Sequence, residues 1–146
     1  MKINTSRFGT IRIKEEKIIT MPFGMLGFPD KKRFVIFQHK TDSPFFWYQS
    51  VDDPALAFVI ANPYLFMPDY QVQLDDILKE MPWNGDGGND QVELYIVVNI
   101  PKGSPHKMTG NLIGPILINN RVCQAVQVVI SDSAYTHKQL LLKDKP

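Results

Sequence analysis

Few side chains in this sequence could do chemistry, and they are scattered along its 146 residues. The three histidines, His39, His106 and His137, lack the close spacing that brings two ligands to one metal ion. Cys123 is the only cysteine, so it can form no internal disulfide and no thiolate cluster. Its small and apolar neighbours favour a buried side chain over an activated nucleophile. We therefore predict neither a metal site nor a nucleophilic active site.

Two acidic segments resemble known sites but lack a required part. Asp52 and Asp53 form a carboxylate pair, but on a turn they would diverge and remain solvated, which does not suit acid–base catalysis. The segment 84–90 (NGDGGND) lacks the terminal bidentate acid of a calcium loop. It is also not followed by Lys-Ser or Lys-Thr, as a phosphate-binding loop would be. We predict no enzyme activity and no cofactor.

A run of four aromatic residues, Phe45, Phe46, Trp47 and Tyr48, raises the question of a binding surface. In an extended segment the first and third side chains face one side, and the second and fourth face the other. One pair can fill a core, and the second pair must meet something else. Either the loop 22–30 covers the second pair, or the pair forms an exposed patch for a protein partner.

The charge is distributed unevenly although the formal net charge is only +1. Residues 1–40 hold nine Lys/Arg and three Asp/Glu, whereas residues 41–98 hold one lysine and ten Asp/Glu. The fold could interleave these regions, or the middle of the chain could form an acidic face that attracts a basic protein. Base stacking on aromatics normally comes with surrounding cations, so we rank a protein partner above RNA.

Alternation of period two and short apolar runs dominate the chain, and we expect one helix, over Leu74–Met81, where apolar residues recur at helical spacing. Interior glycine and proline make 108–118 a bulged or edge strand, and 135–142 could be a strand or a frayed helix. The other expected strands are 2–8, 11–14, 18–21, 33–38, 46–51, 57–61, 92–100 and 125–130. This pattern predicts an all-β barrel or sandwich of eight or more short strands, in a single domain over residues 1–146.

The apolar runs are also informative about location. The longest of them are far shorter than the roughly 18 residues of a membrane helix. The N-terminal segment lacks the apolar region of a secretory signal. We therefore expect a cytoplasmic protein that does not span a membrane.

Three segments together resemble the FliW family of flagellar assembly factors. They are 8–37 (FGTIRIKEEKIITMPFGMLGFPDKKRFVIF), 43–70 (SPFFWYQSVDDPALAFVIANPYLFMPDY) and 107–119 (KMTGNLIGPILIN). The resemblance implies a small bacterial barrel-like protein without catalytic activity. It also implies two partners. One is CsrA, an RNA-binding translational regulator whose repression of flagellin mRNA is relieved, and the other is newly made flagellin.

On this resemblance, an acidic and aromatic face would meet the basic regulator. The candidate contacts are Asp52, Asp53, Asn62, Tyr64, Phe66, Asp69, Tyr70, Asp75 and Asp76. The acids would supply charge, and the loop 62–70 would supply the apolar contacts. This chain has Asn62 where the family often has Asp, and its ending after Tyr135 also departs from the family pattern. The alternative from another class is a barrel that binds RNA directly.

Overall fold

The computed structural model describes residues 1–38, 40–72, 92–131 and 134–142, and in these residues strands dominate. The strands are β1 (Lys2–Thr5), β2 (Gly9–Arg12), β3 (Ile19–Thr20), β4 (Arg33–Phe37), β5 (Phe45–Ser50), β6 (Ala57–Ala61), β7 (Val92–Asn99), β8 (Thr109–Gly110), β9 (Ile116–Asn119), β10 (Gln124–Gln127) and β11 (Gln139–Leu140). Three short 3-10 turns are η1 (Glu15–Lys17), η2 (Pro63–Leu65) and η4 (Pro105–Lys107). The predicted all-β class is confirmed, and the helix expected over Leu74–Met81 lies outside the described residues.

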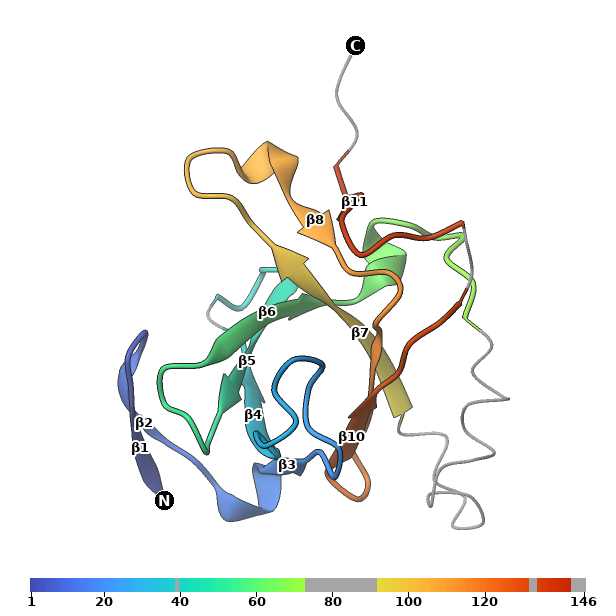
Figure 1. Ribbon diagram of the computed structural model, residues 1–146. Coiled ribbons are helices and arrows are strands. Elements are labelled where there is room, and N and C mark those ends of the chain that lie inside the picture. The colour runs from blue at the N-terminus through green and yellow to red at the C-terminus, as the bar shows by residue number, and fades with distance from the viewer. Residues whose placement is uncertain (39, 73–91, 132–133, 143–146) are drawn as a thin grey trace.

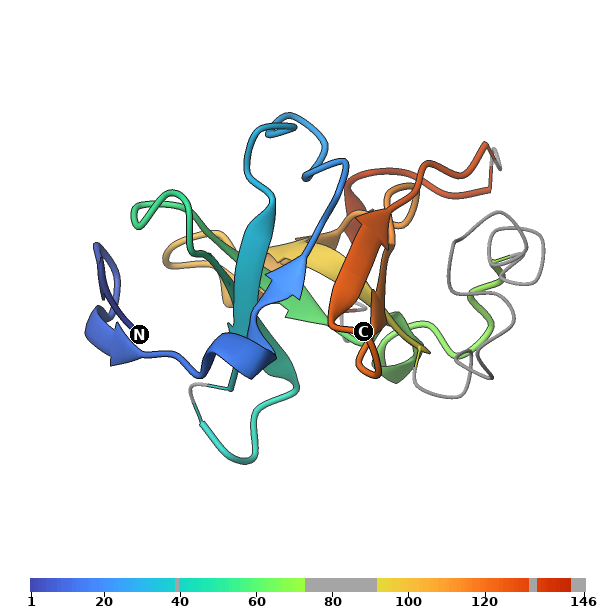
Figure 2. The ribbon, with the colours of Figure 1, turned by 90° about the horizontal axis from the view of Figure 1, so that it is seen from below.

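The strands form a closed ring. Its order is β7, β6, β5, β4, β3, β10 and β9, and β9 pairs back with β7 (Figure 1). Most neighbours are antiparallel, but β3 and β10 are parallel and meet at a single residue pair, Thr20 with Gln124. Strands β8 and β11 extend the sheet beyond β7. The hairpin β1–β2 forms a separate sheet and lies outside the ring in two perpendicular views (Figures 1 and 2).

Strand β7 holds the ring together because it has a neighbour along both sides. Its first half pairs with β9, from Val92 to Tyr95. Its second half pairs with β6 on one side and with β8 on the other. We predicted the apolar segment 108–118 as one bulged or edge strand. The structure instead divides it between β8 and β9, and residues 111–115 connect these two strands. The edge prediction was wrong for β9, whose four residues are all buried because this strand lies between β7 and β10.

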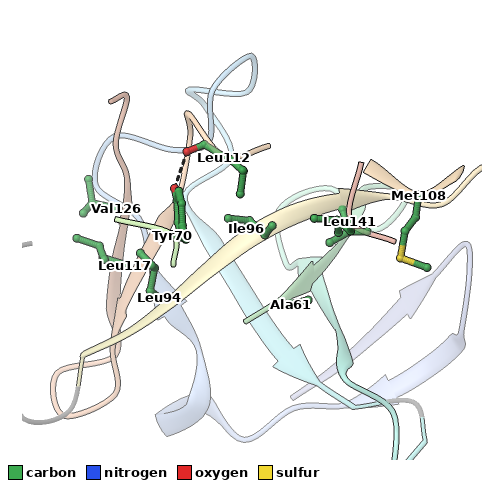
Figure 3. Packing of buried hydrophobic residues seen from close by; sticks show 10 residues of the cluster. Ala61, Tyr70, Leu94, Ile96, Met108, Leu112, Leu117, Val126 and Leu141 are labelled. Atoms are coloured by element: carbon green, nitrogen blue, oxygen red, sulfur yellow. Dashed lines mark hydrogen bonds between the residues drawn. The ribbon is translucent and has the colours of Figure 1, made fainter. Parts of the chain in front are cut away.

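Side chains from alternate strand positions build two main clusters. In one of them, Phe34 stacks on Tyr48 with ring centroids 4.5 Å apart. The other surrounds Tyr70, Ile96 and Leu112 and extends to Met108 and Leu141, which lie next to β8 and β11 (Figure 3). Alternate side chains of a strand face the same side of its sheet, so one strand can contribute to both clusters. Strand β7 does so, with Leu94 and Ile96 in one cluster and Tyr95 in the other.

The loop between β3 and β4, which contains two glycines and two prolines, packs on the core. Met25 is buried, and its N–H and C=O bond with those of Phe28 to make a tight turn. Gly24 has φ +66°, and a Cβ at that position would lie 2.6 Å from the carbonyl oxygens of Phe28 and Pro29. Gly27 also has positive φ, but the space around its absent Cβ is open.

We expect Gly24→Ala to lower the free energy of unfolding by at least about 3 kcal/mol. A left-handed backbone costs a residue with a side chain about 1–2 kcal/mol, and the clash with backbone oxygens adds to that cost. Gly27→Ala is the matched control and should lose only the first part, about 1 kcal/mol. Urea denaturation of both variants measures the difference, and equal losses would contradict the proposed close packing of the loop.

Candidate functional site

The aromatic run lies on β5 and alternates as expected. Phe46 and Tyr48 face the cluster that contains Phe34 and Tyr95. This arrangement uses one aromatic pair to build the core. The second pair, on the opposite face of the strand, is half-buried rather than free.

The cover over the second pair differs from the segment we considered. Phe8, in the turn of the β1–β2 hairpin, packs edge-on against Trp47 at 5.0 Å, and the guanidinium of Arg7 lies 4.8 Å from the same ring. Phe45 stacks on Phe66 at 6.0 Å. The loop 22–30 instead packs its Phe28 against Phe58. The four aromatics are thus largely used within the fold, and the binding surface has to be sought beside them.

A groove of about 510 Å³ opens between the start of β5, η2 and the first half of β7. We call it the β7 groove, and its lining includes Phe46, Asn62, Tyr64, Leu65, Glu93 and Tyr95. It forms because β6 ends early. Ala61 pairs with Ile96, and the next residue turns away instead of continuing beside Tyr95.

The turn that ends β6 is encoded locally by Asn62 and Pro63. The side-chain oxygen of Asn62 accepts a hydrogen bond from the N–H of Tyr64 at 2.9 Å, which caps η2. Pro63 occupies the first position of the turn, where a missing N–H costs nothing. As a result Tyr64 and Leu65 reach the rim of the β7 groove, and 62% of Leu65 is exposed.

One acid is held in fixed position in the β7 groove. The carboxylate of Glu93 accepts hydrogen bonds from the hydroxyl of Tyr95 at 2.6 Å and from Nδ2 of Asn120 at 2.5 Å. Burial, followed by the bond to Glu93, raises the pKa of Tyr95. The groove therefore combines apolar and aromatic walls with one oriented carboxylate, which suits an apolar protein segment that carries a cation.

Our sequence reasoning named Asn62 and Tyr64 but missed Glu93, Leu65 and Phe46 as groove residues. The alternation of β7 could have placed Glu93 and Tyr95 on one face of the strand. No local pattern shows that this face lies opposite η2. Phe66, also predicted, packs against Phe45 beside the groove instead of lining it.

We expected both Asp52 and Asp53 to remain solvated, and for Asp52 this was wrong. Its carboxylate accepts hydrogen bonds from the backbone N–H groups of Lys32 and Arg33 at 3.0 and 3.1 Å. It also accepts from Nε and Nη2 of Arg33 at 2.9 and 2.8 Å. Burial opposes ionisation, but the bonds to Lys32 and Arg33 outweigh it and lower the pKa of Asp52. This acid fastens the β5–β6 turn to the start of β4, so it is not a freely solvated group.

Asp53 and the loop 62–70 do not form one continuous face with each other. Asp53 accepts a hydrogen bond from the N–H of Ala55 within the β5–β6 turn. The β7 groove begins at the opposite end of the same hairpin, where β6 ends at Ala61. Strand β6 has five residues and separates the two by about 17 Å at roughly 3.3 Å per residue. The β5–β6 turn with Asp53 and the β7 groove are therefore distinct surfaces.

Tyr70 is a core residue and not an exposed contact. It is 3% exposed, and its hydroxyl donates to the carbonyl of Leu112 at 2.5 Å (Figure 3). The loop after η2 folds back over the second cluster, which buries this ring. Asp69 beside it is exposed, and Asp75 and Asp76 lie outside the described residues.

The described residues hold neither a candidate metal site nor a candidate membrane-spanning helix. Within residues 1–38, 40–72, 92–131 and 134–142, no group of three or more His, Cys, Asp or Glu side chains is placed to hold a metal ion. No helix in the described part of the chain is long and apolar enough to cross a membrane.

Comparisons with known proteins agree with the resemblance seen in the sequence. The family model described as FliW protein matches residues 2–141. The chain belongs to the FliW family. A flagellar assembly factor FliW of Syntrophus aciditrophicus is 40% identical over 146 residues, covering 99% of this chain and 90% of that protein. One of Geobacter sulfurreducens is 43% identical over 138 residues, covering 94% and 84%.

A solved structure supports the same assignment. The crystal structure of a flagellar assembly factor FliW aligns with a TM-score of 0.87 and 34% identity, and the alignment covers 100% of both chains. The FliW resemblance that we drew from three segments of the sequence is therefore confirmed, and with it the all-β fold.

We expect Asp52→Asn to destabilise the fold by about 1–2 kcal/mol at pH 7, because the amide has no charge to pair with Arg33 and offers one acceptor oxygen in place of two. The Arg33 side chain is 47% exposed, so solvent screens part of the ion pair. The folded-state pKa of Asp52 is lowered, so its contribution is present above the unfolded value near 4 and disappears as pH falls through the folded value. The difference between wild type and variant should therefore shrink between pH 7 and pH 3.

Urea denaturation across this pH range measures the difference. Asp53→Asn is the control, because an asparagine oxygen can still accept from Ala55, and it should change stability by less than about 0.5 kcal/mol. A difference for Asp52→Asn that stays constant over the whole range would contradict the assigned ion pair.

Proposed function

We propose that this FliW-family chain is a cytoplasmic flagellar assembly factor that acts by binding proteins and not by catalysis. It binds a CsrA-type translational regulator, and this binding relieves repression of flagellin mRNA. It also binds flagellin, and the two partners exchange. The observation that carries the proposal is the β7 groove, whose rim exposes Tyr64 and Leu65 beside the fixed carboxylate of Glu93.

The chemistry of the groove favours a protein over RNA. Protein interfaces gain most of their affinity from a few aromatic and apolar anchors in a desolvated pocket. RNA binding instead draws on phosphate contacts from Lys and Arg. No lysine or arginine is among the described residues that line the β7 groove. An RNA-binding regulator carries such cations itself, and Glu93 and the exposed Asp69 offer them a negative counterpart.

The exchange of partners needs only a coupling between two binding events. If flagellin weakens the binding of the regulator, then the regulator must weaken the binding of flagellin by the same factor. Accumulated flagellin would then occupy this chain and release the regulator to repress translation. The coupling could arise from a shared groove or from two linked surfaces, with Asp53 as a proposed second contact.

A gel-shift assay with flagellin leader RNA separates this function from its rival. The chain alone should not retard the RNA if the β7 groove is its binding surface, because no described residue that lines this groove is a lysine or arginine. Added to a complex of the regulator with that RNA, it should release the RNA, and added flagellin should reverse the release. Direct retardation of the RNA by this chain would favour an RNA-binding barrel.

We expect Leu65→Ser to weaken binding of the regulator at least about tenfold, which corresponds to about 1.4 kcal/mol. The substitution removes an anchor of which 62% is exposed, so the fold should be preserved. Val129→Ser is the matched control, because Val129 is 63% exposed and does not line the β7 groove. Calorimetry measures both affinities, and equal affinities would show that the regulator binds elsewhere.

A further inference from the structure

The outer edge of β4 is paired over only part of its length. On one side, β5 pairs with all residues from Phe34 to Phe37. On the other side, β3 is two residues long and reaches only Arg33 and Phe34. The chain that precedes Ile19 folds into η1 instead of continuing along β4. Among the described residues, no strand therefore pairs with this edge beyond Phe34.

The backbone of Ile36 points toward the open side. Backbone N–H and C=O groups of successive strand residues point to opposite sides. The N–H of Val51 donates to the carbonyl of Arg33 at 2.9 Å, so Arg33 faces β5. The N–H of Met21 donates to the carbonyl of Lys32 at 2.7 Å, so even-numbered residues of this segment face β3. Ile36 thus faces the side that β3 has left, and neither of its backbone groups finds a partner in the described part of the chain.

A groove of about 360 Å³ runs along this edge, and we call it the β4 edge groove. Ile13 and Val35 are buried and form part of its apolar floor. Its cationic residues are Arg12, Lys14 and Lys17, all exposed. No described acid lines the groove, and none of the three cations forms an ion pair with a described residue. The β4 edge groove thus combines free main-chain groups, apolar surface and positive charge.

The three cations select among the segments that could pair with the edge. Lysines beside an open strand edge discourage pairing with a second copy, because that copy presents the same charges. A segment with carboxylates has the opposite preference, since its charges complement the rim. An RNA strand would use the cations but not the free backbone groups or the apolar floor. An acidic peptide uses all three features.

We propose that the β4 edge groove receives an extended acidic segment of a protein partner, which adds a strand to β4. In this mode main-chain hydrogen bonds to Ile36 provide affinity, and alternate side chains provide specificity. The apolar side chains of the segment lie on the floor near Val35, and its carboxylates face Lys14 and Lys17. This surface is separate from the β7 groove, so the inference goes beyond the proposed function and does not rest on it.

The test uses a blocked seven-residue peptide that alternates glutamate and valine, followed by NMR of the full chain. In the free protein, the amide of Ile36 should exchange with solvent faster than those of Val35 and Phe37, which face β5. With the peptide bound, exchange at Ile36 should slow at least about tenfold, while the two neighbours change little.

Two controls separate strand addition from simple charge attraction. The double variant Lys14→Glu with Lys17→Glu should weaken peptide binding at least about tenfold. The matched double variant Lys102→Glu with Lys107→Glu, also at exposed lysines, should change it less than twofold. A peptide N-methylated at every residue keeps its charges but loses all of its backbone donors, and it should not protect Ile36.

Several results would overturn the proposal. If the N-methylated peptide bound as tightly as the unmodified peptide, charge attraction alone would explain the binding. Displacement of the peptide by polyuridine that binds more tightly would assign the groove to RNA. Protection of Ile36 that increases with protein concentration, without peptide, would assign the edge to a second copy. Leu65→Ser should leave peptide binding unchanged, so failure here and failure of the regulator assay are distinguishable.

Discussion

Closure of the ring through β7 is the constraint on which the rest of the structure depends. This strand pairs with β9 along its first half and with β6 and β8 along its second half. Without the β7–β9 pairing the sheet would have two open edges, and the buried residues of β9 would keep only β10 as a neighbour. Hydrogen bonding around the ring thus satisfies backbone groups that the core would otherwise leave unpaired.

Both grooves follow from unequal strand lengths within this closed ring. Strand β6 ends at Ala61 because Asn62 and Pro63 start a turn, and the β7 groove fills the place of its missing continuation. Strand β3 is preceded by η1, and the β4 edge groove lies where a longer β3 would have run. The two grooves differ in charge because Glu93 faces one, whereas Arg12, Lys14 and Lys17 face the other.

The sequence predicted the fold class and most strand positions, because period-two alternation is a local property. It did not predict contacts between distant segments. Asp52 looked solvated because its partner, Arg33, belongs to another strand. Tyr70 was named as a candidate partner contact, and its burial was missed because the carbonyl that it bonds, at Leu112, lies far along the chain. The β7 groove was half predicted, since Asn62 and Tyr64 have a local turn pattern but the approach of Glu93 depends on the closed sheet.

The single parallel pair between Thr20 and Gln124 has a consequence for the order of synthesis. The three-stranded meander β4–β5–β6 joins neighbours in sequence and can pair as soon as it leaves the ribosome. The ring cannot close until Gln124 has been added, because β3 needs β10 as its second neighbouring strand and β10 begins at Gln124. During translation the nascent chain is therefore an open sheet, and its early strands stay accessible until β10 emerges.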